Sequence, residues 1–139
     1  MKRAFAALLL GLVVTSLSLA QEKTDAPKVT SDVVTLKGYV VDQMCAKGMA
    51  KKGNPMVKAM GHTKECALED ACAASGFGIF SDGKWVKFDA PGDKLAKASI
   101  EKSKREKGLF FEVSGKMDGE KLAVSSLKES VEEEKAETK

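Results

Sequence analysis

The chain has 139 residues, of which 43% are hydrophobic and 31% charged, with 23 Lys and Arg against 20 Asp and Glu. This length suits a single small domain, and the charges alternate along the chain without a basic stripe interleaved with aromatic residues. The composition therefore argues against a nucleic-acid-binding protein.

Residues 1–20 have the pattern of a cleavable secretory signal peptide. Lys2 and Arg3 supply the positive charge, an uncharged apolar run follows, and Ser18-Leu19-Ala20 places small residues at the cleavage positions. The apolar run is shorter than the roughly 20 residues of a bilayer span, and no later segment is long and apolar enough to form one. We therefore expect a periplasmic or secreted protein without a membrane span, carrying a net charge of +1 after the loss of Lys2 and Arg3.

The remainder divides into a folded region and two polar ends. Residues 21–31 predict a flexible lead, and residues 129–139, which include Glu132-Glu133-Glu134, predict a disordered charged tail. We expect the fold to lie in residues 32–128.

The predicted elements begin with a strand over 33–41, which is rich in β-branched residues and has Gly38 as a bulge or bend. Asp-Gly pairs that favour tight turns predict two hairpins, with a helix between them. These later elements are 76–80 and 84–89 around Asp82-Gly83, a helix over 93–107 ended by Gly108, and 109–117 and 121–127 around Asp118-Gly119.

This order of elements matches that of the OB-fold, in which a helix lies between the third and fourth of five strands. We therefore predict a mainly β fold with helices (α+β): a five-stranded antiparallel OB-like barrel over residues 32–128, with a helical, cysteine-bearing insertion after the first strand. A plain α+β domain built from the same elements is the alternative.

The predicted insertion concentrates the residues that carry chemistry. All three cysteines, the only histidine and four of the six methionines fall within it. They are Met44, Cys45, Met49, Met56, Met60, His62, Cys66 and Cys72.

One interpretation of this segment is a metal site. His62 and Cys66 are four residues apart and can share one face of a helix start, and Cys45 follows the first strand. Cys72 completes a Cys₃His set if the helix predicted over 63–75 is broken. Cys₃His suits zinc, whereas thiolates and imidazole together with methionine thioethers suit Cu(I). We therefore predict a non-catalytic copper or zinc site at Cys45, His62, Cys66 and Cys72.

A second interpretation is a disulfide, which export and a small core both favour. On a continuous helix over 63–75, Cys66 and Cys72 are about 9 Å apart along the axis, beyond the limit of about 7 Å between the Cα atoms of a disulfide. Cys45 is then the partner of one of them. Cys45–Cys66 is preferred if Cys72 is a buried small hydrophobe, with Cys45–Cys72 as the alternative. Under this interpretation the protein is a disulfide-stapled binding or interaction module without metal.

A third interpretation is a thiol redox protein with Cys66 as the nucleophile, although the chain has no Cys-x-x-Cys pair. The sequence contains no serine nucleophile elbow, which argues against ordinary hydrolytic catalysis.

We expect the binding partner of the protein to be an unknown protein or small ligand and not a nucleic acid.

Three strings carry a resemblance to a known group of proteins. They are Gly38-Tyr39-Val40-Val41-Asp42-x-x-Cys45, His62-Thr63-Lys64-Glu65-Cys66-Ala67-Leu68 and Cys72-x-x-Ser75-Gly76-Phe77-Gly78. With them, residues 36–127 resemble small exported, largely uncharacterised bacterial proteins that are OB-like and share a Cys, His-x-x-x-Cys, Cys pattern after the first strand. The resemblance implies an OB-like fold and a joint role for the three cysteines and His62. It implies no substrate, and the methionines are not part of the shared pattern.

Overall fold

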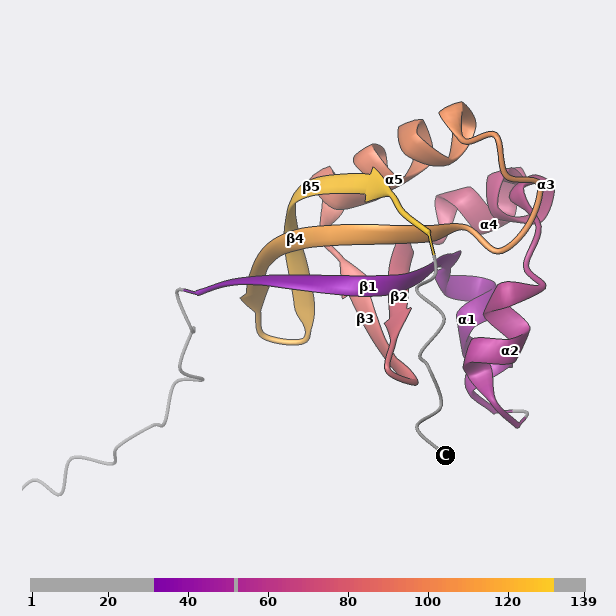
Figure 1. The fold of residues 1–139 in the computed structure, drawn as a ribbon, viewed down its shortest axis with the longest axis horizontal. Helices are drawn as coiled ribbons and strands as arrows, with labels where there is room; N and C mark the ends of the chain where they lie inside the picture. The colour runs from indigo at the N-terminus through magenta and orange to yellow at the C-terminus, as the bar shows by residue number, and fades with distance from the viewer. Residues whose placement is uncertain (1–31, 52, 132–139) are drawn as a thin grey trace, which may run out of the picture.

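The structure is a computed structural model that describes residues 32–51 and 53–131 (Figure 1). The predicted signal peptide (1–20), the flexible lead (21–31) and the tail from residue 132 on lie outside the described residues. The described part is an α+β fold. Its elements in order are β1 (Val33–Asp42), α1 (Gln43–Ala50), α2 (Pro55–Met60), α3 (Lys64–Leu68), α4 (Asp70–Ala74), β2 (Phe77–Ser81), β3 (Lys84–Phe88), α5 (Ala90–Lys102), β4 (Phe110–Asp118) and β5 (Lys121–Glu129).

The strands of the described residues close in a ring in the order β1-β2-β3-β5-β4. In this ring β1 lies between β4 and β2. Residues 33–39 of β1 pair with β4, and residues 39–42 pair with β2. The prediction of an all-antiparallel sheet was wrong, since β3 and β5 pair in parallel through Lys87 and Phe88. The α5 crossover and the β4–β5 hairpin bring β5 to run in the same direction as β3, so the sheet is mixed.

Both predicted hairpins are confirmed. Between β2 and β3, Asp82 and Gly83 have φ of 48° and 77°, the positive values that a type I′ turn requires. The β4–β5 turn contains Gly119 at φ 60°. Gly38 is required for a close approach and not for a bulge, because a Cβ there would lie 1.9 Å from the carbonyl oxygen of Phe80 in β2.

The predicted helix over 93–107 is displaced toward the N-terminus. α5 begins at Ala90, because the side chain of Asp89 caps it by accepting from the backbone N–H of Gly92 at 2.9 Å. It ends at Lys102, because Ser103 adopts an extended conformation with ψ 141°. The chain then runs alongside the start of α3, with Lys107 bridged to Thr63.

The start of the predicted tail belongs to the fold. Glu129 is the last residue of β5, and its Oε1 lies 3.2 Å from Nε of Arg105 and accepts from the hydroxyl of Ser103 at 3.0 Å. Ser130 donates its backbone N–H to the carbonyl of Phe110 at 3.0 Å. No helix of the described residues is long and apolar enough to cross a membrane.

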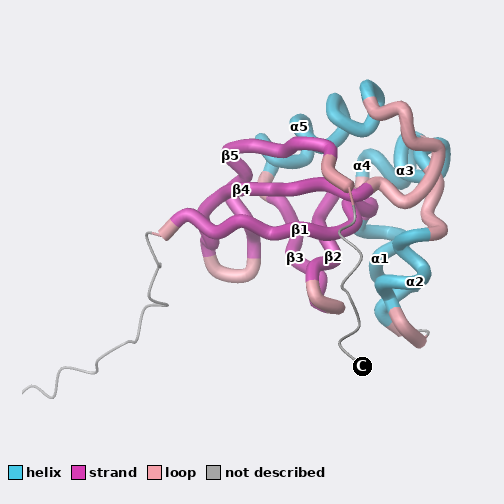
Figure 2. Tube along the Cα trace, viewed as in Figure 1, coloured by secondary structure: helices cyan, strands magenta, loops and turns pink. Residues whose placement is uncertain are grey.

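Two apolar clusters organise the packing, and both involve β1. One holds Val40, Ile79 and Phe111 together with residues of α5, and the other places Tyr39 and Val41 against α1 and α2. Because alternate residues of a strand point to opposite faces, the buried end of β1 serves both clusters. As predicted, helices follow the first strand, and α1 to α4 lie together beside one end of the ring, where α3 contacts α5 (Figure 2).

Candidate metal centre

The first part of the site lies where β1 passes into α1. Asp42 is fully buried and caps α1, because its Oδ1 accepts from the backbone N–H of Cys45 at 2.8 Å. Two further bonds hold the start of α1 against the end of α4: the N–H of Gln43 donates to the carbonyl of Gly76 at 2.8 Å, and that of Met44 donates to the hydroxyl of Ser75 at 3.1 Å. Cys45 is therefore fixed relative to the sheet.

Cys66 occupies the same local position at the start of α3. Thr63 caps that helix by accepting from the backbone N–H of Cys66 at 3.2 Å, so each of these two cysteines lies three residues after a capping side chain. The segment before α3 is held by the connection to β4, since Lys64 donates to the carbonyl of Glu106 at 2.8 Å and Gly108 donates to that of His62 at 3.0 Å.

The helix predicted over 63–75 is broken, and this break places Cys72. Glu69 lies between α3 and α4 with φ −58° and ψ 137°, far from helical values. A continuous helix would turn Cys66 and Cys72 to different faces. With the break, Cys72, which is 5% exposed, faces the same interior as Cys45 and Cys66.

The ligand atoms of Asp42, Cys45, Cys66 and Cys72 all lie within 4.8 Å of one another. We call these four residues the donor cluster. Sγ of Cys45 and Sγ of Cys66 are 3.7 Å apart, and two sulfurs bound at about 2.3 Å to a tetrahedral zinc are separated by about 3.8 Å. A disulfide bond is about 2.05 Å long, and all three cysteines are free.

His62, predicted as a ligand, lies next to the donor cluster and outside it. Its Nε2 is 3.1 Å from Oδ2 of Asp42, and the two side chains are 5% and 0% exposed. The contact is close enough for an ion pair but is not aligned as a hydrogen bond, so within the described residues Oδ2 of Asp42 and both ring nitrogens lack an aligned partner. Leaving buried polar atoms without partners costs free energy. These three atoms therefore have bonding capacity that the described residues do not use.

The pKa values of the thiols and of the carboxylate in the site are shifted in opposite directions. Burial raises the pKa of the Cys45 and Cys72 thiols, and the nearby Asp42 carboxylate raises both further. Burial also raises the pKa of Asp42, but its contacts with His62 and the N–H of Cys45 lower it by more, so its pKa is below the ordinary value. At neutral pH the metal-free site thus holds a carboxylate beside protonated thiols of Cys45 and Cys72, and a metal must displace protons from them.

A hollow of about 620 Å³ gives access to the donor cluster from the side of α3. Cys66 is the one member of the cluster that lines it, while Asp42 and Cys72 are buried behind. The complete lining is Thr63, Glu65, Cys66, Leu68 and Glu69. A metal ion or a small reagent in this hollow therefore meets Cys66, and Cys45 is also partly exposed.

The methionines that pointed to copper occupy ordinary positions. Met49 and Met56 pack against the apolar cluster around Tyr39. Met44 and Met60 are 53% and 47% exposed. Packing and surface exposure account for all four side chains.

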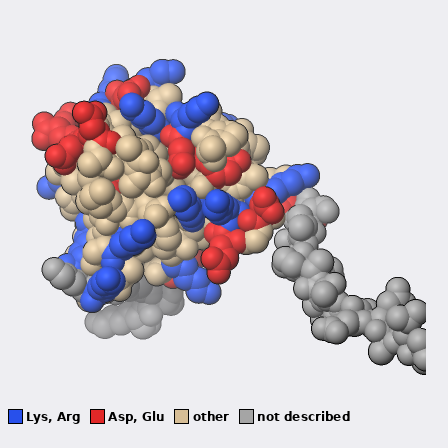
Figure 3. Space-filling view, turned by 180° about the vertical axis from the view of Figure 1, so that it is seen from behind, with Lys and Arg blue, Asp and Glu red and all other residues tan. Residues whose placement is uncertain are grey.

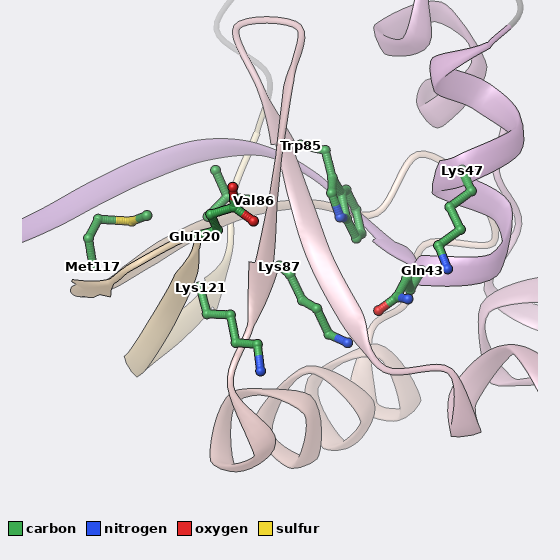
Figure 4. A pocket seen from close by; sticks show the side chains of 8 residues that line it. All are labelled: Gln43, Lys47, Trp85, Val86, Lys87, Met117, Glu120 and Lys121. Carbon is green, nitrogen blue, oxygen red and sulfur yellow. The ribbon is translucent and has the colours of Figure 1, made fainter. Parts of the chain in front are cut away.

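A larger hollow, of about 660 Å³, lies over the outer face of β3 and contains no member of the donor cluster (Figure 4). Trp85 lies between Gln43 and Lys47 of α1 on one side and Lys121 near the β4–β5 turn on the other.

On the face of the molecule seen in Figure 3, Lys and Arg are interspersed with Asp and Glu.

Asp42 is the member of the donor cluster that the sequence prediction missed. Its signal is the string Asp42-x-x-Cys45, an acidic residue at the junction of a strand and a helix and three residues before a cysteine. Such an Asp is more often only a helix cap, and only the fold shows that it meets Cys66 and Cys72. No protein-family model, curated protein sequence or solved structure gave a significant match to the chain.

Proposed function

We propose that this chain is a non-catalytic metal-binding domain that holds one zinc ion through Cys45, Cys66, Cys72 and Asp42. The observation that carries the proposal is the convergence of four donor atoms within 4.8 Å from β1, α1, α3 and α4. Three thiolates and one carboxylate make a complete set for a four-coordinate structural zinc site.

Zinc is favoured over copper by the donors and by charge. A carboxylate oxygen is a common ligand of zinc, whereas Cu(I) prefers soft sulfur donors. With all four donors ionised the cluster carries four negative charges, and a divalent ion neutralises more of this buried charge than Cu(I) does. The four methionines add no argument for copper, because their positions are explained by packing and exposure.

His62 supports the site without being a ligand. A buried group beside a metal-binding carboxylate fixes its orientation and adjusts its basicity. The contact of 3.1 Å between Nε2 of His62 and Oδ2 of Asp42 suits this role.

We further propose that the domain is OB-like and works outside the cytoplasm. A closed ring of strands with a helix between β3 and β4 supports the first part. The signal-peptide pattern of residues 1–20 and the resemblance to small exported bacterial proteins support the second.

Cobalt substitution tests the proposed site directly. Reduced, metal-free protein is titrated with Co²⁺, and a tetrahedral thiolate site gives intense visible absorption together with sulfur-to-cobalt charge-transfer bands, which stoichiometric Zn²⁺ then abolishes. Cys72→Ser is expected to weaken these bands, whereas Asp118→Asn, an exposed change at the end of β4, is expected to leave them unchanged. Absence of both the cobalt spectrum and stoichiometric zinc would refute the proposal.

A further inference from the structure

We infer that the donor cluster is also a thiol–disulfide exchange site, at which a small disulfide oxidises Cys66 and Cys45 and thereby releases the metal. The inference rests on the proposed zinc site, but the exchange chemistry depends only on the positions of the two cysteines. Its co-reactant is the disulfide of a low-molecular-weight thiol such as glutathione.

Proximity selects Cys45 and Cys66 as the reacting pair. Their sulfurs are 3.7 Å apart, so they must approach by about 1.7 Å to reach the length of a disulfide bond. They lie on separate short helices, α1 and α3, and each is only partly buried. Cys72 is buried, and a small disulfide cannot reach it directly.

The accessibility of the two cysteines determines the order of the two exchange reactions. Cys66 lines the hollow of about 620 Å³ beside α3, whereas Cys45 packs against the apolar cluster around Tyr39. The Cys66 thiolate attacks the incoming disulfide, so that a mixed disulfide forms and one small thiolate leaves. Cys45 loses its bond to the metal or, in metal-free protein, gives its proton to solvent, and the resulting thiolate attacks Sγ of Cys66 so that the second small thiolate leaves. Two cysteine thiolates have lost two electrons, and one small disulfide has gained them.

Oxidation and metal binding use the same sulfur atoms and therefore exclude each other. A Cys45–Cys66 disulfide removes two of the four donors and leaves only Cys72 and Asp42. Two donors are fewer than the three protein ligands that even open zinc sites provide. The bound ion is released, and reduction by two equivalents of small thiol restores the site.

The test uses reduced, zinc-loaded protein treated with oxidised glutathione. Released zinc is read with a chromophoric chelator, and the cysteine linkages are mapped by mass spectrometry without reduction. We expect one Cys45–Cys66 disulfide and two glutathione molecules per zinc released. Cys45→Ser is expected to stop at a stable mixed disulfide on Cys66, and Cys66→Ser to remain unmodified on the same timescale.

Cys72→Ser separates this inference from the zinc proposal. It is expected to bind zinc poorly and yet to form the Cys45–Cys66 disulfide at least as fast as the metal-free parent protein. Failure of the parent protein to bind zinc would refute the proposed function, while the metal-free protein would still test the exchange. A zinc-loaded protein that forms a disulfide through Cys72, forms none, or keeps its zinc after oxidation would overturn the inference.

Discussion

Replacement of Asp42 by Asn and by Ala separates the three tasks of this residue. Asp42 caps α1, contacts His62 and belongs to the donor cluster. Asn keeps a side-chain oxygen that can accept from the N–H of Cys45, and it is as good a cap as Asp. It removes the charge that faces His62 and the carboxylate that would bind the metal. Ala removes all three contributions.

The expected magnitudes differ between metal-free and zinc-bound protein. Without metal, Asp42→Asn should lower the free energy of unfolding by about 1–3 kcal/mol, the usual cost of leaving a buried polar group, here His62, without its partner. Asp42→Ala should cost about 1 kcal/mol more, because the cap is also lost. With zinc at about 1,000 times its Kd, the parent protein gains about 4 kcal/mol. Both variants should lose at least about 1.4 kcal/mol of that gain, because their zinc affinity should fall at least about 10-fold.

Urea unfolding followed by fluorescence of Trp85, the only tryptophan, measures these differences with chelator and with zinc. Asp118→Asn provides the matched control for loss of a carboxylate at an exposed position. Equal zinc affinity in Asp42→Asn and the parent protein would show that Asp42 is not a ligand. Equal stability of the Asn and Ala variants without metal would refute its role as a cap.

Four further predictions follow from the structure. Because the pKa of Cys45 and Cys72 is raised, zinc binding should release protons and weaken as pH falls, which calorimetry in buffers of different ionisation enthalpy measures. The lowered pKa of Asp42 contributes stability above the unfolded value of about pH 3.9, and this contribution is lost as pH falls through the folded value; acid unfolding of metal-free protein should therefore be less steep in Asp42→Asn. Gly38→Ala should destabilise by about 1–3 kcal/mol through its clash with β2, whereas Gly48→Ala, in open space on α1, should stabilise by about 0.5–1 kcal/mol; opposite signs in urea unfolding would contradict the packing. Thr63→Ala should cost about 1 kcal/mol and Thr63→Ser almost nothing, as measured by thermal unfolding, because only the hydroxyl caps α3.

The sequence predicted the local elements of the fold better than their assembly. The Asp-Gly turns and the β-branched first strand depend on local backbone preferences, and the structure has them where the pattern indicated. The parallel pairing of Lys87 with Lys121 and the early end of α5 at Lys102 depend on contacts between distant segments, which local preference does not encode. The OB-like assignment stays a prediction.

The residues of the donor cluster were likewise predicted only in part from the sequence. The concentration of cysteines identified Cys45, Cys66 and Cys72, which the structure brings together. Asp42 was missed because an acidic residue just before a helix is more often only a cap, and the contact that places His62 beside Asp42 depends on the fold. The break at Glu69, which brings Cys72 to the cluster, also depends on the fold. No residue near 69 is a glycine or proline, so the break had no recognisable signal in the sequence.

The donor cluster also has a consequence for the order of folding. All four donors fall within residues 42–72, whereas closing the ring requires β1 to pair with β4, for example Val34 with Gly115. Closing a short loop costs less chain entropy than closing a long one, and local contacts form sooner than distant ones. Zinc should therefore order the insertion first and present the buried end of β1 as a template, so that the metal acts on the rate of folding as well as on final stability.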